Sequence, residues 1–377
     1  MRITICTSGR FHVADLAREL IGLGHDVVFH SIVPKRRLEG FGIPRSNQRC
    51  YLGWVLPFLF AQRKLKLQPS FNQRLDRQTM RILDARFSRI AQPGEVFIGM
   101  SGLCLKSLLA AKEKGSKILL ERGSRHILSQ KQILENIEKP GTASVSPWTI
   151  KRELRGYDIA DTIVVGSMHV EESFLNRQTD SSRLFRNPYG VNLEEFQPTR
   201  LSDAPFDVIM VGLWCRRKGS DMLAEVVLNK LGLTLLHVGP VGDIELPKND
   251  RFQHVEPVAQ NMLPQYYSQA RIFAMPSHEE GLAMVQAQAL ACGLPVAGST
   301  RSGAQDLAKL TRLGRPIITA ITPGNENELA LAIDAALSWS RKHQMVVRDL
   351  LENKREELSW KAYGERYSDY LNQKCKN

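Results

Sequence analysis

Short apolar runs, each followed by a turn and then by a helical pattern, recur along the whole chain. In the first half they occupy residues 2–6, 25–30, 96–102, 117–121 and 161–167. The segment after the first run has apolar side chains at i, i+3, i+4 and i+7, which predicts an amphipathic helix; these residues are Val13, Leu16, Ala17 and Leu20. Near-continuous apolar strands that alternate with helices predict parallel sheets with helices on both faces.

The same alternation restarts after a turn-rich connector, NPYGVNLEEFQP, at residues 187–198. Further strand-like runs follow at residues 206–212, 233–239, 271–277, 295–299 and 316–321. A chain of 377 residues suits two domains of about 150 to 200 residues each. In such doubly wound folds, ligands bind beyond the carboxyl ends of the strands.

We therefore predict an α/β protein with two Rossmann-like, doubly wound parallel-sheet domains that face each other across a cleft. The first domain is expected to span residues 1–197 and the second residues 198–359. The carboxyl-terminal helix, at about residues 360–377, follows an apparently complete second domain and is expected to cross back to the first.

The net charge of +12 is concentrated near the amino terminus. Between Lys35 and Arg89, thirteen Lys or Arg residues stand against three acidic residues, which gives this window a charge of +10. It encloses the apolar stretch YLGWVLPFLF at residues 51–60, which is shorter than the roughly 20 residues of a membrane span. An apolar patch ringed by basic residues is typical of proteins that lie on anionic membranes. The alternative is an irregular core helix with solvated basic neighbours.

Other classes of partner and location receive less support from the sequence. No helix-turn-helix, zinc-knuckle or RNP-like pattern accompanies the positive charge, so nucleic acid is not an expected partner. The six cysteines show no CxxC pair, and the amino terminus has no signal segment, which predicts a cytoplasmic protein with reduced thiols. Cys292 has no paired base in its sequence context and is not expected to act as a nucleophile.

The stretch SHEEGLAM, residues 277–284, reads as a turn between a strand and a helix. Gly281 would let the backbone approach a ligand, and the amides of Leu282, Ala283 and Met284 are expected to be free donors for a phosphate. Glu280 beside a phosphate would be repelled unless it faced neutral sugar hydroxyls. The alternative is an acidic first turn that only complements the helix dipole.

Several segments together resemble one family. The run PSHEEGLAMVQAQALACGLPVAGS resembles the signature of family 4 retaining glycosyltransferases of the GT-B fold. The connector NPYGVNLEEFQP is similar to their interdomain connector, and VGLWCRRKGSDML is similar to the opening of their second domain. DIADTIVVGS and LPQYYSQARIFAMPS also fit, and the order of the segments is that of the family.

The resemblance implies roles for residues of the second domain. Glu280 would contact the donor sugar, and Lys218 would neutralise the nucleotide diphosphate. Leu213 stands where the family usually has Arg, so Arg216 or Arg217 would supply the second positive charge. Gln288 replaces the second Glu of the family's pair, and its amide oxygen would accept from the ribose less strongly than a carboxylate.

Further roles follow from the same resemblance. Gly9 would give the diphosphate access to the backbone of the first loop, although an ordinary tight turn is the alternative. His126, in the segment ERGSRHI, would meet the donor sugar, and Val258, in HVEPV, would touch the nucleobase. From their location, Arg122, Arg125 and His12 are assigned to the acceptor side.

The function implied is a retaining hexosyltransferase that uses a nucleotide diphosphate sugar, with UDP-glucose or a similar UDP-linked donor preferred. The acceptor would be a saccharide or a lipid-linked saccharide in polysaccharide biosynthesis, at the inner face of the membrane. The DxD metal motif of the other major glycosyltransferase fold is absent, so no metal cofactor is expected. Gln288 and Leu213 motivate the alternative of a non-catalytic nucleotide-sugar-binding scaffold, and a GT-B nucleotide-sugar epimerase is a third possibility.

Overall fold

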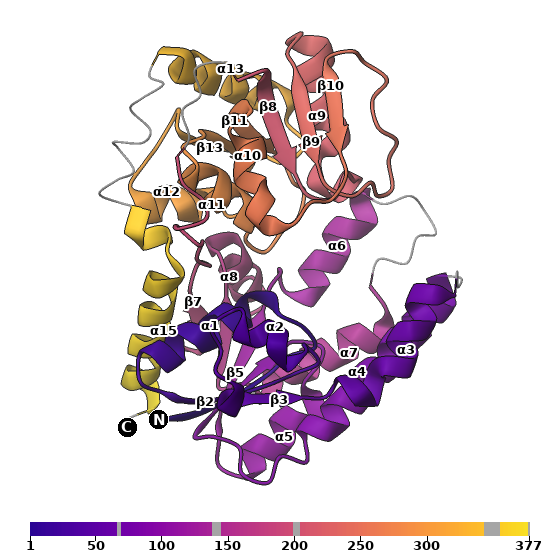
Figure 1. The fold of residues 1–377 in the computed structure, drawn as a ribbon, viewed down its shortest axis with the longest axis vertical. Coiled ribbons are helices and arrows are strands. Elements are labelled where there is room, and N and C mark those ends of the chain that lie inside the picture. Colours follow the sequence, from indigo (N-terminus) through magenta and orange to yellow (C-terminus); the bar gives the residue numbers. More distant parts are fainter. Residues whose placement is uncertain (66–68, 138–144, 199–203, 343–354, 376–377) are drawn as a thin grey trace.

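Two parallel β-sheets organise the chain, one in each of two domains stacked end to end (Figure 1). The structure is a computed structural model that describes residues 1–65, 69–137, 145–198, 204–342 and 355–375. Each strand pair within the sheets is parallel, as the apolar runs predict. The fold class predicted from the sequence is therefore confirmed.

The first domain contains a seven-stranded sheet of order β3-β2-β1-β4-β5-β6-β7. Its strands are β1 (Arg2–Cys6), β2 (Asp26–Ser31), β3 (Gln48–Cys50), β4 (Val96–Met100), β5 (Lys117–Arg122), β6 (Thr162–Val165) and β7 (Leu184–Arg186). Its helices are α1 (Phe11–Gly22), α2 (Lys35–Glu39), α3 (Leu52–Lys64), α4 (Pro69–Phe87), α5 (Leu105–Glu113), α6 (Ile127–Ile137), α7 (Pro147–Ile159) and α8 (Met168–Leu175).

The second domain contains a six-stranded sheet of order β10-β9-β8-β11-β12-β13. Its strands are β8 (Phe206–Val211), β9 (Leu235–Val238), β10 (Phe252–Val255), β11 (Ala270–Met275), β12 (Val296–Ser299) and β13 (Ile318–Ile321). Its helical segments are η3 (Arg216–Lys218), α9 (Ser220–Ala224), η4 (Glu225–Lys230), η5 (Gln260–Met262), α10 (Leu263–Tyr267), α11 (Met284–Ala291), α12 (Ala304–Thr311) and α13 (Glu326–Lys342).

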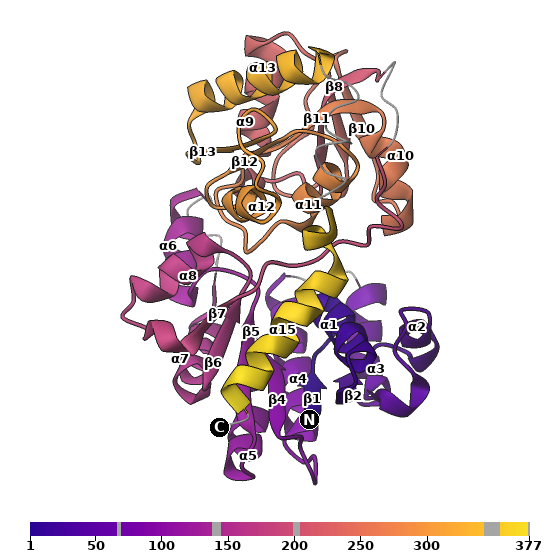
Figure 2. The same ribbon diagram turned by 90° about the vertical axis from the view of Figure 1, so that its left-hand side faces the viewer.

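The carboxyl-terminal helix α15 (Trp360–Cys375) leaves the second domain and runs along the first, beside α1 (Figure 2). The contact between these helices is close, because a Cβ added at Gly364 would lie 2.3 Å from Cβ of Glu19. Tyr367 is fully buried, and its hydroxyl donates to Oε1 of Glu121, at 2.7 Å, at the end of β5. The return of this helix to the first domain is thus confirmed, whereas the domain limits at 197 and 198 stay a prediction.

The apolar stretch at residues 51–60 forms most of α3, which packs on α4 to make a helical hairpin (Figure 1). Val55 is buried, but Trp54, Leu56 and Phe60 are each more than half exposed. One face of this stretch thus packs on the core of the first domain through Val55, Tyr51 and Leu59, while the other face is exposed, so the structure does not decide between the two alternatives. No helix among the described residues is both long and apolar enough to cross a bilayer.

Replacing Tyr367 by Phe should destabilise the protein, because the buried carboxylate of Glu121 loses a hydrogen-bond donor. We expect the free energy of unfolding, measured by urea titration, to fall by about 1–3 kcal/mol. Tyr266→Phe is the matched control, since the described residues offer its hydroxyl no hydrogen-bond partner and it is only partly buried. Equal stability of Y367F and the parent would show that α15 is not anchored through this contact.

Candidate functional site between the two domains

The loop after β11 presses directly against the loop after β5, so the two domains touch at their strand ends. A Cβ added at Gly281 would lie only 1.9 Å from the carbonyl oxygen of Gly123. Real Cβ atoms do not approach a backbone atom so closely, so only glycine fits at position 281 without a shift of one loop. Gly281 therefore serves the contact between the domains, where the sequence predicted a close approach to a ligand.

The first domain binds the backbone around Gly281 through side chains at the start of α8. The hydroxyl of Ser167 donates to the carbonyl oxygen of Gly281 at 2.6 Å, and Nε2 of His169 lies 2.9 Å from that of Glu280. Because a carbonyl can only accept, Nε2 carries the proton. Burial lowers the pKa of His169 to about 4, so the ring is neutral at pH 7.

Two acidic side chains of the second domain add to this interface. Glu279 is fully buried and accepts hydrogen bonds from Ser124 and from Gln130 of α6. Asp306, on α12, accepts from the backbone amide of Met168 at 3.0 and 3.1 Å, so it caps helix α8 of the other domain. Burial raises the pKa of Asp306 to about 6. The interface thus consists largely of buried polar groups with specific partners.

Glu280 forms an ion-pair cluster with two basic residues of η3. Its Oε1 lies 3.0 Å from Nζ of Lys218 and 3.1 Å from Nη1 of Arg217, without the alignment of a hydrogen bond. Burial acts to lower the pKa of Arg217, but Glu280 and Glu279 outweigh it and raise that pKa. The structure thus brings together three residues that the sequence assigned to the donor, namely Glu280, Arg217 and Lys218, and Glu279 also pairs with Arg217.

The structure distinguishes between Arg216 and Arg217 as the second cation that the sequence predicted in place of Leu213. Leu213 is 36% exposed and carries no charge. Of the two candidates for the second cation, Arg216 extends to Asp221, at 3.6 Å, whereas Arg217 faces Glu280. Of the two, Arg217 is therefore the one that shares the carboxylate of Glu280 with Lys218.

Fewer backbone amides are free at the start of α11 than the sequence predicted. The amide of Ala283 donates to the carbonyl oxygen of Ser302 at 3.0 Å, so the prediction that it is a free donor was wrong. The amides of Leu282 and Met284 have no acceptor among the described residues. The side chain of Leu282 packs into the core of the first domain, which draws this turn toward the interface.

His126 does not lie with the Glu280 cluster. Its ring is 5% exposed and packs against Tyr157 and Phe174, with ring centroids 5.0 and 5.1 Å away. Its Nδ1 accepts from the amide of Leu128 at 3.3 Å, and burial lowers its pKa to about 4. This packing favours a structural role for the ring.

Gln288 is 5% exposed on α11, and its Oε1 lies 3.4 Å from the hydroxyl of the buried Tyr267. That hydroxyl also lies 3.2 Å from the carbonyl oxygen of Val285. The amide oxygen that the sequence assigned to the ribose therefore faces a partner within the second domain.

Gly9 and Val258 do not themselves line the large cavity between the domains, although a chain neighbour of each does. The amide of Gly9 donates to Oγ1 of Thr7 at 3.2 Å, which closes a turn after β1, and Val258 packs at the edge of the second core. Their neighbours Arg10 and Ala259 both line a cavity of about 730 Å³ that spans the two domains. Its size falls within the range of small-molecule sites, but none of the residues predicted for the donor site lines it.

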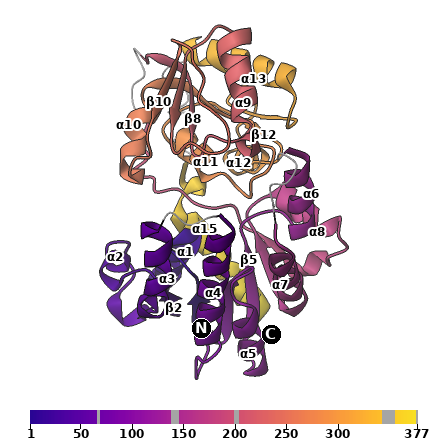
Figure 3. The same ribbon diagram turned by 90° about the vertical axis from the view of Figure 1, so that its right-hand side faces the viewer.

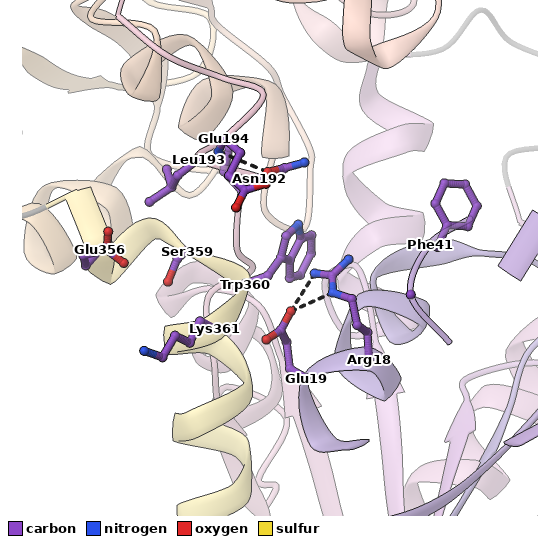
Figure 4. A pocket seen from close by; sticks show the side chains of 12 residues that line it. Arg18, Glu19, Phe41, Asn192, Leu193, Glu194, Glu356, Ser359, Trp360 and Lys361 are labelled. Atoms are coloured by element: carbon purple, nitrogen blue, oxygen red, sulfur yellow. Dashed lines mark hydrogen bonds and ion pairs between the residues drawn. The ribbon is translucent and has the colours of Figure 1, made fainter. Parts of the chain in front are cut away.

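A smaller cavity of about 490 Å³ lies where the connector meets α1 and α15 (Figure 4). Trp360 stands in it between the Arg18–Glu19 ion pair and Asn192 of the connector. None of the residues predicted for the donor site lines this cavity. At this cavity, the connector and the start of α15 both pass between the two domains. The cavity lies apart from the Glu280 cluster.

The residues predicted for the acceptor side are held in buried polar networks. His12 lies 2.9 Å from Oε2 of Glu121 and stacks on Tyr189, with ring centroids 4.3 Å apart. Nη1 of Arg122 donates to Glu153 at 3.1 Å. The structure thus ties His12 and Arg122 to internal carboxylates.

Metal and thiol chemistry receive no support from the geometry of the described residues. Within them, no three His, Cys, Asp or Glu side chains form a group able to hold a metal ion. Cys292 is fully buried, and burial raises the pKa of its thiol to about 12. Such a thiol is not a nucleophile at neutral pH.

Comparison with known proteins identifies the architecture. The chain superposes over 99% of its length on sucrose-phosphate synthase from Thermosynechococcus elongatus, with a TM-score of 0.67, 18% identity and 98% of that chain covered. It matches the Anabaena protein HepE in complex with UDP-glucose equally well, with a TM-score of 0.67, 15% identity, and coverage of 99% of this chain and 100% of that one. The fold is GT-B.

The second domain of this GT-B protein also matches at the level of sequence. Residues 205–338 match the family described as glycosyl transferases group 1. A segment of 173 residues is 28% identical to D-inositol 3-phosphate glycosyltransferase of Xylanimonas cellulosilytica, and it covers 38% of this chain and 42% of that relative. The chain therefore carries a group 1 glycosyltransferase domain, and the match spans less than half of the curated relative.

Replacing Gly281 by Ala should loosen the contact between the domains, because the new methyl group would collide with the backbone of Gly123. We expect the free energy of unfolding in urea to fall by about 1–3 kcal/mol, the usual cost of overpacking. Gly22→Ala is the control, since nothing lies within 4 Å of a Cβ added there. If G281A and G22A were equally stable, the domains would not meet as described.

Proposed function

We propose that this protein is a metal-independent, retaining glycosyltransferase of family 4. It would transfer a hexose from a nucleotide diphosphate sugar, most simply UDP-glucose, to a saccharide or lipid-linked acceptor in polysaccharide biosynthesis. The observation that carries the proposal is the Glu280 cluster, in which Arg217 and Lys218 share one carboxylate beside the turn into α11. Anabaena HepE, which has the same fold, is known in complexes with UDP and with UDP-glucose.

The cluster fits the charges that such a reaction develops. When the bond between the anomeric carbon and the phosphate oxygen breaks, the diphosphate leaves with added negative charge. Lys218 and Arg217 would stabilise that charge, as preorganised cations do in sites that exclude water. Glu280, released from the cations by the phosphates, would accept hydrogen bonds from sugar hydroxyls.

Retention follows from a front-face reaction that needs no enzyme nucleophile. The acceptor hydroxyl would attack the anomeric carbon from the side of the leaving diphosphate and pass its proton to the departing phosphate oxygen. The cavity lined by Arg10 and Ala259, the chain neighbours of Gly9 and Val258, would give room for part of the nucleotide. Closure of the domains around the donor would exclude water and so limit its hydrolysis.

The second candidate function is a nucleotide-sugar-binding scaffold without transfer activity. It is favoured by two observations: the amide of Ala283 is already occupied, and the amide oxygen of Gln288 faces Tyr267. A scaffold would bind UDP-sugar and release no UDP with any acceptor. An epimerase, in contrast, would interconvert nucleotide sugars when no acceptor is present.

Glu280→Ala separates binding from transfer. Loss of the carboxylate frees Lys218 and leaves Arg217 paired with Glu279 alone, so UDP should bind at least as tightly as to the parent by calorimetry. The transfer rate should fall by about 100-fold or more, since a group that orients the reacting sugar is gone. Glu113→Ala, an exposed change on α5, is the control. An unchanged transfer rate in E280A would remove Glu280 from the reaction.

We also propose that the hairpin of α3 and α4 rests on an anionic membrane, where a lipid-linked acceptor would be found. Large apolar side chains protrude from it: Trp54, Leu56, Phe60, Leu65 and Phe71. Arg86 stacks on Trp54, with its guanidinium carbon 3.2 Å from the ring centroid, and Arg74 and Arg81 are exposed nearby on α4. Aromatic and basic side chains on one exposed element fit the interface of an anionic bilayer.

Flotation with vesicles tests this surface. The parent should bind vesicles that contain phosphatidylglycerol at low salt and should bind neutral vesicles much less. Trp54→Ala with Phe60→Ala should abolish most of the binding, because the apolar side chains that enter the bilayer are removed. Leu331→Ala, a change at an exposed apolar residue of α13, should have no effect. Equal binding by the double variant would reject the hairpin as the contact.

A further inference from the structure

A third cavity opens between the domains, beside α6 rather than beside the Glu280 cluster. Its volume is about 520 Å³. The first domain contributes α6 and the end of α8, and the second contributes the loops after β11 and β12; Figure 3 shows α6 reaching from the first domain toward the second. The charged residues that line it are all basic, namely Arg125, Arg177 and Arg301, and His278 adds an imidazole.

The positive charge of this cavity is not neutralised by the protein. No described carboxylate lies within ion-pair distance of Arg177 or Arg301. Arg125 donates from Nη1 to the carbonyl oxygen of His169 at 3.0 Å, while its Nε is buried without a partner. Burial lowers the pKa of Arg125, and the charge of Arg301 lowers it further. These guanidinium groups therefore repel one another in the absence of a ligand.

The nearest carboxylates compensate that charge only in part: Glu279 and Glu172 raise the pKa of Arg125 against the effects of burial and of Arg301. Glu279 follows His278 in the chain, but it is fully buried and already accepts from Ser124 and Gln130. Its pairing with Arg217, at 3.4 Å, belongs to the Glu280 side of the loop. Arg125 and Arg301 are half-buried, and Arg177 is exposed at the edge of the cavity. Clustered cations with little counter-charge repel one another, and an anionic ligand offsets that repulsion.

We propose that this cavity binds the phosphoryl group of a small molecule, either free phosphate or a sugar phosphate. Guanidinium groups present paired N–H donors that match phosphate oxygens, which makes arginine clusters typical phosphate sites. Asn136 and Asn176 add amide groups to the lining, and these can bind the hydroxyls of an attached sugar. The cavity is large enough for such a molecule.

A ligand held there would touch both domains and so favour their closed arrangement. Arg125 and Arg177 come from the first domain, and Arg301 and His278 from the second. The backbone of Arg301 accepts the amide of Glu280 at 3.1 Å, and that of Arg217 accepts the amide of His278 at 2.9 Å. The ligand would therefore restrain the loops that carry the donor cluster, and phosphate and UDP should each strengthen the binding of the other.

Calorimetry with inorganic phosphate tests the site directly. The titration is run at constant ionic strength on the parent, on Arg177→Gln with Arg301→Gln, and on Arg155→Gln, a change at a surface residue of α7 that is 61% exposed. Loss of the two guanidinium groups should weaken phosphate binding by roughly ten-fold or more. R155Q should bind like the parent. Repeating the titration with saturating UDP blocks the donor site, and phosphate binding should persist there.

Glucose 6-phosphate, with glucose as its control, distinguishes the two sources of the phosphoryl group. If the sugar phosphate binds more tightly than phosphate, the cavity also contacts the sugar hydroxyls, and the ligand is a sugar phosphate. If the two bind equally, the ligand is free phosphate. Both outcomes support the site. No phosphate binding by the parent, equal binding by R177Q/R301Q, or displacement of phosphate by UDP would overturn the proposal. Phosphate binding that depends on Arg177 and Arg301 in a protein that ignores UDP would reject the proposed transferase and leave this site standing.

Discussion

The contact between Gly281 and Gly123 determines how the rest of the molecule is arranged. Because nothing larger than a hydrogen atom fits at position 281, the loop after β11 can lie flat against the end of β5. Ser167 and His169 then reach the carbonyl oxygens of two consecutive residues, Gly281 and Glu280. The buried polar partners fix one orientation of the two sheets, since any other orientation would leave them unsatisfied.

Because the orientation of the domains is fixed, the Glu280 cluster has a defined geometry in which it could bind an anion. Glu280 holds two cations close together in a partly buried place, and Glu279 also pairs with Arg217. A dianionic ligand can replace the carboxylate, because it neutralises both cations and leaves Glu280 free for neutral hydroxyls. The loop after β11 separates this cluster from the arginine-lined cavity beside α6. Two sites that we propose for anions therefore lie on either side of this loop.

The sequence predicts the sheets well, because buried parallel strands are near-continuous apolar runs. It misses three edge strands, β3, β7 and β10. β3 and β7 are only three residues long, and all three carry polar side chains, such as Gln48, Arg186 and Gln253. In the site, Lys218 and Glu280 are found from local motifs. The occupied amide of Ala283 and the aromatic surroundings of His126 depend on residues distant in the chain, and no local pattern reports them.

The interface residues were missed for the same reason. Ser124 and Glu279 are 155 positions apart, and His169 and the carbonyl oxygen of Glu280 are 111 apart. Of these interface residues, the sequence drew attention only to the two adjacent carboxylates of the SHEEG segment. The sequence pattern does not show which of these two carboxylates is buried. Local sequence thus identifies groups that carry charge, whereas their partners follow from the packing of the two domains.

The most direct test is a crystal structure of the protein with UDP. The account predicts that the diphosphate contacts Lys218 and Arg217 and that the carboxylate of Glu280 has left both of them. UDP bound elsewhere, with the pairing of Glu280 to Lys218 and Arg217 intact, would contradict it.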